Sequence, residues 1–243
     1  MSTNRGVIWD RPARAARGPA PSLSREEITR AAVTLADTQG IEALSMRALA
    51  VELGVGAASL YRYVARKDEL IDLMADAVMG TVQFEVRGDW REDLRSFARG
   101  LQATILQHPW MAIEGAGRTT LGPNTAQCFE RVLGAIDGLG LDIDELLLML
   151  ETLDAFIRGR AIEELSDQEA IRRSGLDNEQ WMKIQAPYVE SLIGSGRYPL
   201  LSRVVLYAHG PHDPDRLKRG FDRGLEVVLD GLATMLPDSD PGR

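Results

Sequence analysis

Apolar residues recur every three to four positions along most of the chain, which is the spacing of one face of an α-helix, and strand-like alternation is hard to find. The first apolar stripe consists of Ile28, Ala31, Ala32 and Leu35. It predicts a helix over residues 25–38, with Ser24 and Glu27 spaced as a capping box at its start. The pattern indicates an all-α protein.

From residue 68 onward the helical patterns become longer, and breaks that contain glycine and proline separate them. The predicted helices cover residues 68–86, 90–107, 124–139, 143–174, 178–193, 200–208 and 215–236. Segments of this kind are typical of a helical bundle. We therefore expect a small domain over residues 23–67, joined to a larger helical domain over residues 68–243.

Two short helices joined by a glycine turn are predicted within residues 44–70. Ser45 is a suitable N-cap for the first helix, and Gly54 is a suitable left-handed residue at its end. The second helix begins two residues later, and Leu60 and Val64 mark its buried side four positions apart. This layout is that of a helix-turn-helix.

The second of these helices has the residue types that a DNA major groove requires. Small residues at its start let the backbone approach the base edges, and hydrogen-bonding residues follow them. The small residues are Ala57, Ala58 and Ser59, and the later donors are Tyr61, Arg62 and Tyr63. Lys67 begins the next helix, where exposed N–H groups favour a phosphate. The alternative is a helix hairpin inside an all-α core, with the basic residues on a solvated face.

The same segment resembles the DNA-binding head of the tetracycline-repressor (TetR) family. The resemblance rests on residues 39–47, on Leu53-Gly54-Val55, and on residues 60–64 and 67–70, and it covers about residues 24–78. It implies an all-α homodimer that represses transcription. A small molecule in the larger C-terminal domain would release this dimer from a palindromic operator. The resemblance implies neither an enzyme nor a cofactor or metal ion.

The resemblance also implies roles for single residues of the head. Arg47 matches a position that often reads a base, and residues 57–59 match the base-facing start of the recognition helix. Tyr61, Tyr63 and Lys67 match contacts to backbone phosphates, and Arg62 is a further candidate for a base contact. Ala65 stands where many members carry lysine, and Ala57-Ala58 replaces commoner polar or proline residues. These departures leave the operator sequence open.

The formal charge is distributed unevenly between the two predicted domains. The whole chain carries −8, but residues 1–67 hold 10 Lys or Arg against 6 Asp or Glu, hence +4, and the remainder carries −12. DNA attracts the basic domain and repels the acidic one, so the field favours approach by the helix-turn-helix. The charge split supports a DNA-binding face on the first domain.

Residues 1–22 are predicted to form a disordered basic arm. They contain four arginines and three prolines among small residues and cannot bury a core. One hypothesis is that the arm follows the DNA backbone or enters a minor groove. The other is that it is a solubilising tail. No secretory signal is recognisable, since no apolar run follows the basic residues.

Two of the later helices are apolar around much of their circumference, which favours a two-fold dimer interface. The residues assigned to this interface are Leu146, Leu150, Leu153, Phe221, Gly224, Leu225, Val228 and Leu232. A dimer would also supply the second recognition helix that a palindromic operator needs. The alternative is a central bundle helix within a monomer.

A ligand-binding region is expected among large apolar residues and a few polar ones of the C-terminal domain. The candidates are Gln107, His108, Trp110, Met111, Arg118, Phe129, Met149, Phe156, Trp181 and Tyr188. For each apolar residue in this set the alternative is ordinary core packing.

Two other classes of protein are weighed against this interpretation. An all-α enzyme would need a site, and His209, His212 and Asp213 lie in a proline-glycine loop without a frame to fix metal ligands. A ligand-independent architectural DNA-binding protein would leave so large a C-terminal domain without a purpose. The single cysteine, Cys128, excludes an internal disulfide, and no apolar stretch reaches about 18 residues. We expect a bacterial cytoplasmic protein that lies at the nucleoid when bound to DNA.

Overall fold

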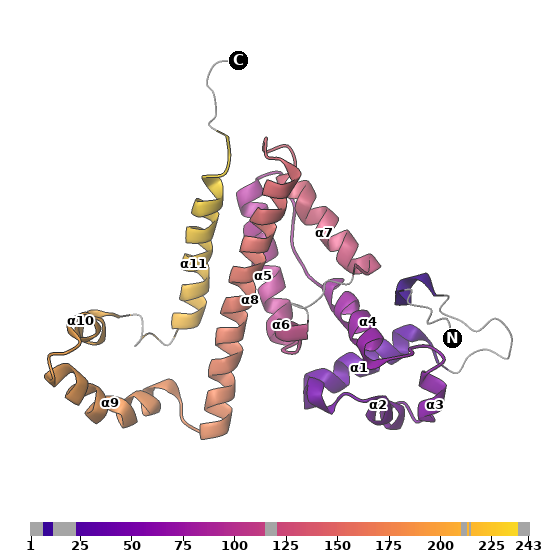
Figure 1. Ribbon diagram of the computed structural model, residues 1–243, viewed down its shortest axis with the longest axis horizontal. Coiled ribbons are helices and arrows are strands. Elements are labelled where there is room, and N and C mark those ends of the chain that lie inside the picture. Colours follow the sequence, from indigo (N-terminus) through magenta and orange to yellow (C-terminus); the bar gives the residue numbers. More distant parts are fainter. Residues whose placement is uncertain (1–6, 12–22, 115–120, 210–212, 214, 238–243) are drawn as a thin grey trace, which may run out of the picture.

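The computed structural model describes residues 7–11, 23–114, 121–209, 213 and 215–237, and it contains helices but no strand within these ranges. Figure 1 shows three parts: a compact head near the N-terminus, a central body of long helices, and an arm that extends from the far end of α8. The predicted all-α architecture, with a helix-turn-helix domain ahead of a larger helical domain, is confirmed.

The head contains α1 (Arg25–Gln39), α2 (Met46–Glu52) and α3 (Ala57–Leu60). Ser24 and Glu27 form the predicted capping box of α1, and the Ser45 side chain accepts from the Ala48 N–H at the start of α2. The interior of the head is made of fully buried side chains of all three helices. They include Ile28, Leu49 and Leu60, joined by Val64 after α3.

Helix α4 (Lys67–Met79) joins the head to the body and ends earlier than the predicted residue 86. The apolar spacing continues through Val82, but the chain leaves the helix at Gly80 and runs as an irregular segment to α5. Val82 and Phe84 are nevertheless buried, because this segment lies close against Gly100 of α5, where any side chain would collide with the Gln83 carbonyl. Packing of the segment on α5, not a helix, explains its apolar residues.

The body contains α5 (Trp90–Gln107), the short α6 (Met111–Glu114), α7 (Pro123–Ile136), α8 (Ile143–Ser174) and α11 (Arg216–Ala233). In Figure 1, α8 runs through the middle, with α5 behind it and α11 along one side, and α5 contacts both α8 and α11. A row of arginines on α5 faces a row of carboxylates on α11. The ion pairs join Arg91 to Asp230, Arg95 to Glu226 at 2.7 Å, and Arg99 to Asp222 at 2.9 Å.

The arm consists of α9 (Asn178–Gly194) and α10 (Pro199–Tyr207). Gly175 takes the left-handed conformation (φ +69°) that ends α8 and turns the chain into α9. The arm points away from the body (Figure 1), and no residue of either helix is buried.

Part of the N-terminal segment, residues 1–22, which was predicted to be disordered, has a fixed place in the structure. Residues 8–10 form a 3-10 helix, and the Ile8 side chain is buried in the core. The Arg25 guanidinium donates to the carbonyls of Ile8 and Arg11, at 3.4 and 2.8 Å. The prediction of disorder is therefore wrong for residues 7–11, because one isoleucine can be buried without a core of the segment's own. Residues 1–6 and 12–22 lie outside the described residues.

Candidate DNA-binding face and ligand-binding region

Residues 57–64, here called the recognition segment, pack on the head through one side and present the other side to solvent. Leu60 and Val64 are fully buried, whereas Ala58, Tyr61 and Arg62 are exposed, with 54% of Tyr61 accessible. Ser59 and Ala57 are half-buried at the start of the helix. In Figure 1, α2 and α3 lie on the side of the head that faces away from the body. The predicted base-facing residues of the recognition helix therefore reach an open surface.

A glycine turn sets the angle between α2 and α3. Gly54 has φ +64°, a conformation that L side chains rarely adopt. The Val55 N–H donates to the Ala50 carbonyl at 2.9 Å, and α3 begins directly after Gly56. No atom lies within 4 Å of where a Cβ of Gly54 or Gly56 would stand, so the turn leaves the approach to α3 unobstructed.

The remaining DNA-contact candidates surround the recognition helix. Arg47 is exposed in the first turn of α2, while Tyr63 and Lys67 are half-buried. The Tyr63 carbonyl accepts from Arg25 Nε at 3.2 Å, and Lys67 Nζ donates to the Ile41 carbonyl at 3.4 Å. All eight predicted DNA-contact residues belong to the head or to the first residue of α4, so the structure brings this set together.

Glu69, in the first turn of α4, fastens the recognition segment from behind. Its carboxylate is buried, accepts from the Ala65 N–H at 2.9 Å, and pairs with Arg11 at 2.5 Å and with Arg66 at 3.4 Å. Burial opposes ionisation, but the hydrogen bonds from Arg11 and Ala65 outweigh it and lower the pKa of Glu69. Sequence reasoning missed this contact because Arg11 lies 58 positions from its partner in a segment expected to be disordered.

The predicted ligand residues do not converge on one pocket. His108, Trp110 and Met111 are buried between α5 and α6, and Met149 lies in the body core. Phe156 is half-buried against Phe221, with ring centroids 5.6 Å apart. The others are separate: Gln107 and Phe129 are exposed on α5 and α7, Trp181 and Tyr188 are exposed on the arm, and Arg118 lies outside the described residues.

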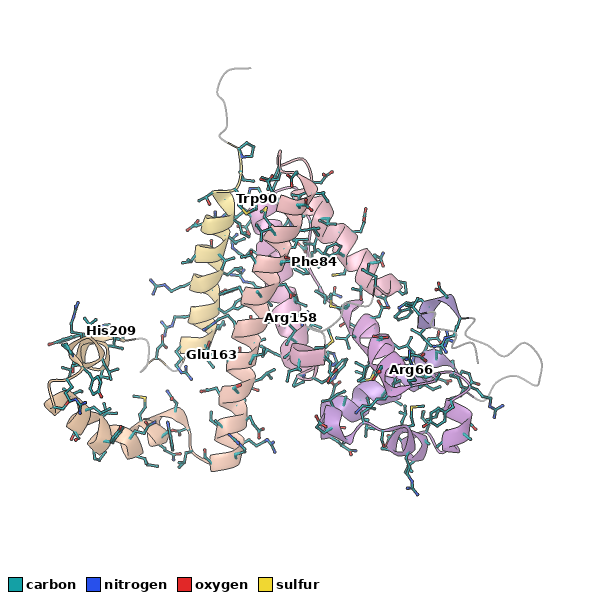
Figure 2. All side chains as sticks on the ribbon, in the orientation of Figure 1. Arg66, Phe84, Trp90, Arg158, Glu163 and His209 are labelled. Carbon is teal, nitrogen blue, oxygen red and sulfur yellow. The ribbon has the colours of Figure 1, made fainter. Side chains whose placement is uncertain are left out.

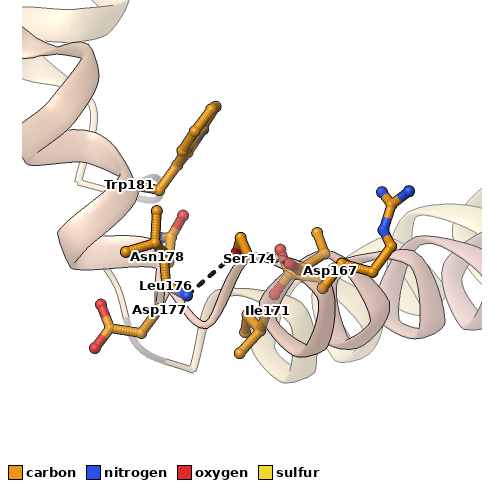
Figure 3. Close-up of a pocket in the computed structure, with 9 residues that line it drawn as sticks. Asp167, Ile171, Ser174, Leu176, Asp177, Asn178 and Trp181 are labelled. Carbon is orange, nitrogen blue, oxygen red and sulfur yellow. Dashed lines mark hydrogen bonds between the residues drawn. The ribbon is translucent and has the colours of Figure 1, made fainter.

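A groove lies at the corner between α8 and α9 and has a volume of about 440 Å³. Figure 3 shows Ile171 and Ser174 of α8, then Leu176 and Asp177, and Trp181 of α9 around it. The Leu176 N–H donates to Ser174 Oγ at 3.2 Å and helps to hold the corner. Of the ten ligand candidates only Trp181 lines this groove, which is open to solvent and does not enclose a ligand as most small-molecule sites do.

Most of the residues predicted for the dimer interface are buried inside the single chain. Six of them are buried within the single chain: Leu146, Leu150, Leu153, Phe221, Leu225 and Leu232. Gly224 accommodates the Phe156 ring, which a side chain there would strike, and Val228 is half-buried. Their apolar character serves the packing of α8 on α11, so these six side chains are not available to a partner chain.

Neither a metal-ligand cluster nor a membrane-spanning helix is found among the described residues. These residues hold no group of three or more metal-ligating side chains; of the loop residues considered above, His212 lies outside them. No described helix is both long enough and apolar enough to cross a bilayer.

Both parts of the chain match known sequence families. Residues 28–74 match the family described as bacterial regulatory proteins, tetR family, and residues 85–236 match the family described as tetracyclin repressor-like, C-terminal domain. The HTH-type transcriptional repressor DrrR1 of Streptomyces coeruleorubidus is 39% identical over 95% of this chain and 84% of its own length. These matches extend well beyond the DNA-binding head.

Solved structures of similar proteins agree with these family matches. Streptomyces coelicolor ActR in complex with actinorhodin is 28% identical, with a TM-score of 0.74 over 90% of this chain and all of its own. Mycobacterium smegmatis BioQ with its DNA operator has a TM-score of 0.57 at 21% identity, over 87% of this chain and 99% of its own, which shows a shared fold. With its exposed recognition helix, its two family matches and a repressor as relative, the chain belongs to the tetracycline-repressor (TetR) family and is a transcriptional regulator, not an enzyme.

Proposed function

We propose that the chain binds a palindromic operator as a homodimer and leaves it when a small molecule binds the body. The observation that carries this proposal is the exposed surface of α3, fixed on a buried side that includes Leu60 and Val64. A recognition helix that is rigid behind and open in front suits insertion into a major groove. The protein would act at the nucleoid, in the bacterial cytoplasm.

Within the head we assign two kinds of DNA contact. Residues that face the groove would read bases: these are Arg47, Ala57, Ala58, Ser59 and Arg62. Residues at the flanks would hold the phosphate backbone: these are Tyr61, Tyr63 and Lys67. The exposure of Arg47 and Arg62 supports direct readout, since an arginine can bind a guanine through two hydrogen bonds.

A second copy of this chain is the partner that we propose for the arm and for the outer faces of α8 and α11. Large apolar side chains on the arm are 45–73% exposed, and such clusters on a soluble protein mark interaction sites. They are Trp181, Ile184, Tyr188, Leu200, Leu201, Val204, Leu206 and Tyr207. Ile143, Leu148 and Ile162 of α8 and Val227 of α11 extend this apolar surface on the body. A two-fold dimer would place two recognition helices at half-sites about 34–36 Å apart.

For the effector we propose a site in the body that is completed by the partner. The body of one chain carries the half-buried Phe156, and the arm carries the exposed Trp181 and Tyr188. If the arm of one copy covers the body of the other, these aromatic groups come from both chains. The relative ActR has been solved with actinorhodin, so actinorhodin is a reasonable first probe.

Selection of bound fragments from the genome of the source bacterium tests the DNA-binding part of the proposal. We expect enrichment of fragments with an inverted repeat, and a shift to a two-protomer complex on the isolated fragment. Enrichment of no fragment, or of fragments without a repeat, would contradict operator binding by a dimer.

The same fragment tests release. Actinorhodin and a library of small organic molecules are added to the complex, and a compound that releases the fragment should also raise the melting temperature of the free protein. A protein that keeps its operator in the presence of every compound that binds it would instead be the ligand-independent architectural DNA-binding protein.

A further inference from the structure

A hydrogen-bonded cluster connects α1 of the head directly to the body. Asp37, in the last turn of α1, lies with both carboxylate oxygens 2.9 Å from His108 Nδ1. Its Oδ1 also accepts from Trp110 Nε1 at 2.8 Å. Because an ionised carboxylate only accepts, the Nδ1–H tautomer of His108 donates to it. One acidic residue of the head thus holds two residues of the body.

The two donors belong to a short rigid segment. His108 ends α5, and Trp110 directly precedes α6; both are buried, and the Met111 side chain after them is only 1% exposed. The Met111 N–H donates to the His108 carbonyl at 2.8 Å, which closes a turn over these residues. A shift of one residue in this segment will therefore move the others.

The opposite end of this segment is tied to α8. Arg158 donates from Nη1 to the Met111 carbonyl at 3.0 Å and from Nε to Asp154 at 2.7 Å. Figure 2 shows Arg158 on α8, at the level of α6. Within residues 108–111, Met111 is thus held by α8 of the body, and His108 and Trp110 are held by α1 of the head.

We infer that residues 108–111 form a relay that couples the position of α8 to that of α1, and through α1 to the recognition helix. The inference rests on the proposed ligand-controlled release and names α1, besides α4, as a helix of the head on which the body acts. In α4, the buried Asp76 accepts from the Thr125 N–H at 2.8 Å and from the Asn124 side chain at 3.0 Å, both at the start of α7. The body therefore holds α1 of the head as well as α4.

A change in α8 can reach α1 through these hydrogen bonds. A change in α8 that withdraws Arg158 frees the Met111 carbonyl, and the turn that contains Trp110 and His108 must then adjust. Asp37 either follows its two donors, which moves α1, or loses them. In both cases the packing of α1 against α2, on which α3 packs in turn, differs between the two states of the body, which is the requirement for coupling between sites.

The test is a double-mutant cycle at the two ends of the relay, measured without DNA or ligand. Asp37→Ala removes the head end and Arg158→Gln the body end; the two residues share no partner, so independent effects would simply add. In each single variant we expect faster amide exchange at residues 108–114 than in the wild-type protein. In the double variant the acceleration should be about tenfold smaller than the product of the two single accelerations. Additive effects would overturn the relay.

A control and a milder variant keep this result interpretable. Asp93 is more deeply buried than Asp37 but accepts from the Arg87 and Gly88 N–H groups within the body, so Asp93→Asn with Arg158→Gln should be additive. If Asp37→Ala does not fold, Trp110→Phe replaces it, because it keeps an aromatic ring and removes one donor to Asp37.

An operator duplex supplies the functional readout. Its binding should change amide exchange at residues 108–114 in the wild-type protein, and Trp110→Phe should reduce this change by at least about half while the duplex is still bound. An unchanged response in Trp110→Phe would give the cluster a structural role only. Failure to find any operator would count against the proposed function, whereas the cycle above would still decide the relay.

Discussion

The head and the arm are two short helical segments that place their apolar side chains in opposite ways. In the head, Ile28, Leu49 and Leu60 are fully enclosed by helices of the same segment. In the arm no residue of α9 or α10 is buried, and Tyr188 and Leu200 are 66% and 70% exposed. Since apolar surface in water is unfavourable, the head is complete within one chain and the arm requires a further surface.

The exposed surfaces of the head and the arm also differ in chemical character. The exposed side of the recognition segment is small, polar and basic, which suits DNA, whereas the exposed side of the arm is aliphatic and aromatic, which suits protein. We therefore expect the two ends of this molecule to recognise different partners. Changes that affect only one of them will separate the two functions.

The largest effect is expected from Leu60→Ala, in the core of the head. The side chain is fully buried, so its truncation leaves a cavity and should lower the free energy of unfolding by about 3–4 kcal/mol. Urea denaturation followed by circular dichroism measures this loss. Val51→Ala is the matched control, because Val51 is 78% exposed on α2 and its change should be within about 0.5 kcal/mol. Equal losses in both variants would show that the head has no distinct core.

On the arm, the double variant Ile184→Ser with Tyr188→Ser should weaken the proposed dimer. Burial of each side chain against a partner is worth about 1.5–3 kcal/mol, so the dimer dissociation constant should rise by roughly 100-fold or more. Sedimentation over a concentration series measures the constant, and circular dichroism should show unchanged helicity. A dimer of unaltered strength would remove the arm from the interface.

Local patterns predicted the head and two long helices of the body well. The capping box at Ser24, the turn at Gly54 and the buried pair Leu60 and Val64 depend on neighbours within a few positions, and each lies in the structure as predicted. The same holds for the helices over residues 90–107 and 143–174, whose ends match the prediction.

Features that depend on distant partners were not predictable in this way. The apolar faces of α8 and α11 were assigned to a dimer because a sequence cannot tell which surface covers an apolar residue. The structure places Leu150 and Leu225 inside one chain, where α8 packs on α11. Likewise, the carboxylate of Asp37 receives donors from positions 71 and 73 residues away, a separation that no local period encodes.

Glu69→Gln should loosen the attachment between the recognition segment and α4. Because the pKa of Glu69 is lower in the folded state, its ionised form stabilises the fold above the unfolded-state pKa of about 4.3, and this stabilisation is lost as the pH falls through the folded-state value. At pH 7 the variant should lose about 2 kcal/mol, the range for hydrogen bonds to a charged group. Denaturant unfolding at pH 7 and below pH 4 should show the difference from wild type shrinking with acidity. A constant difference would contradict a role for the charge.

Arg47→Ala should change DNA recognition without changing the fold. Arg47 is exposed, and if it reads a guanine its loss should cost about 1–3 kcal/mol of operator affinity and relax the preference at one base pair. Binding to the operator and to variants of each base pair measures both effects. Arg203→Ala, an exposed arginine on the arm, is the matched control and should bind the operator as wild type does. If Arg47→Ala weakens operator and random DNA equally, Arg47 contacts phosphate.

The smallest effect is expected from Lys67→Ala. The salt dependence of DNA affinity should change in this variant but not when a lysine of the arm is replaced. A lysine that contacts a phosphate displaces about one counterion, so the slope of log affinity against log salt should fall by about one unit per half-site. In the free protein Lys67 donates only to the Ile41 carbonyl at 3.4 Å, so its removal should cost little stability. Lys183→Ala removes an exposed lysine of the arm that pairs with Glu179 at 2.6 Å, and it should leave the slope unchanged. Equal slopes for Lys67→Ala and Lys183→Ala would mean that Lys67 lies outside the DNA footprint.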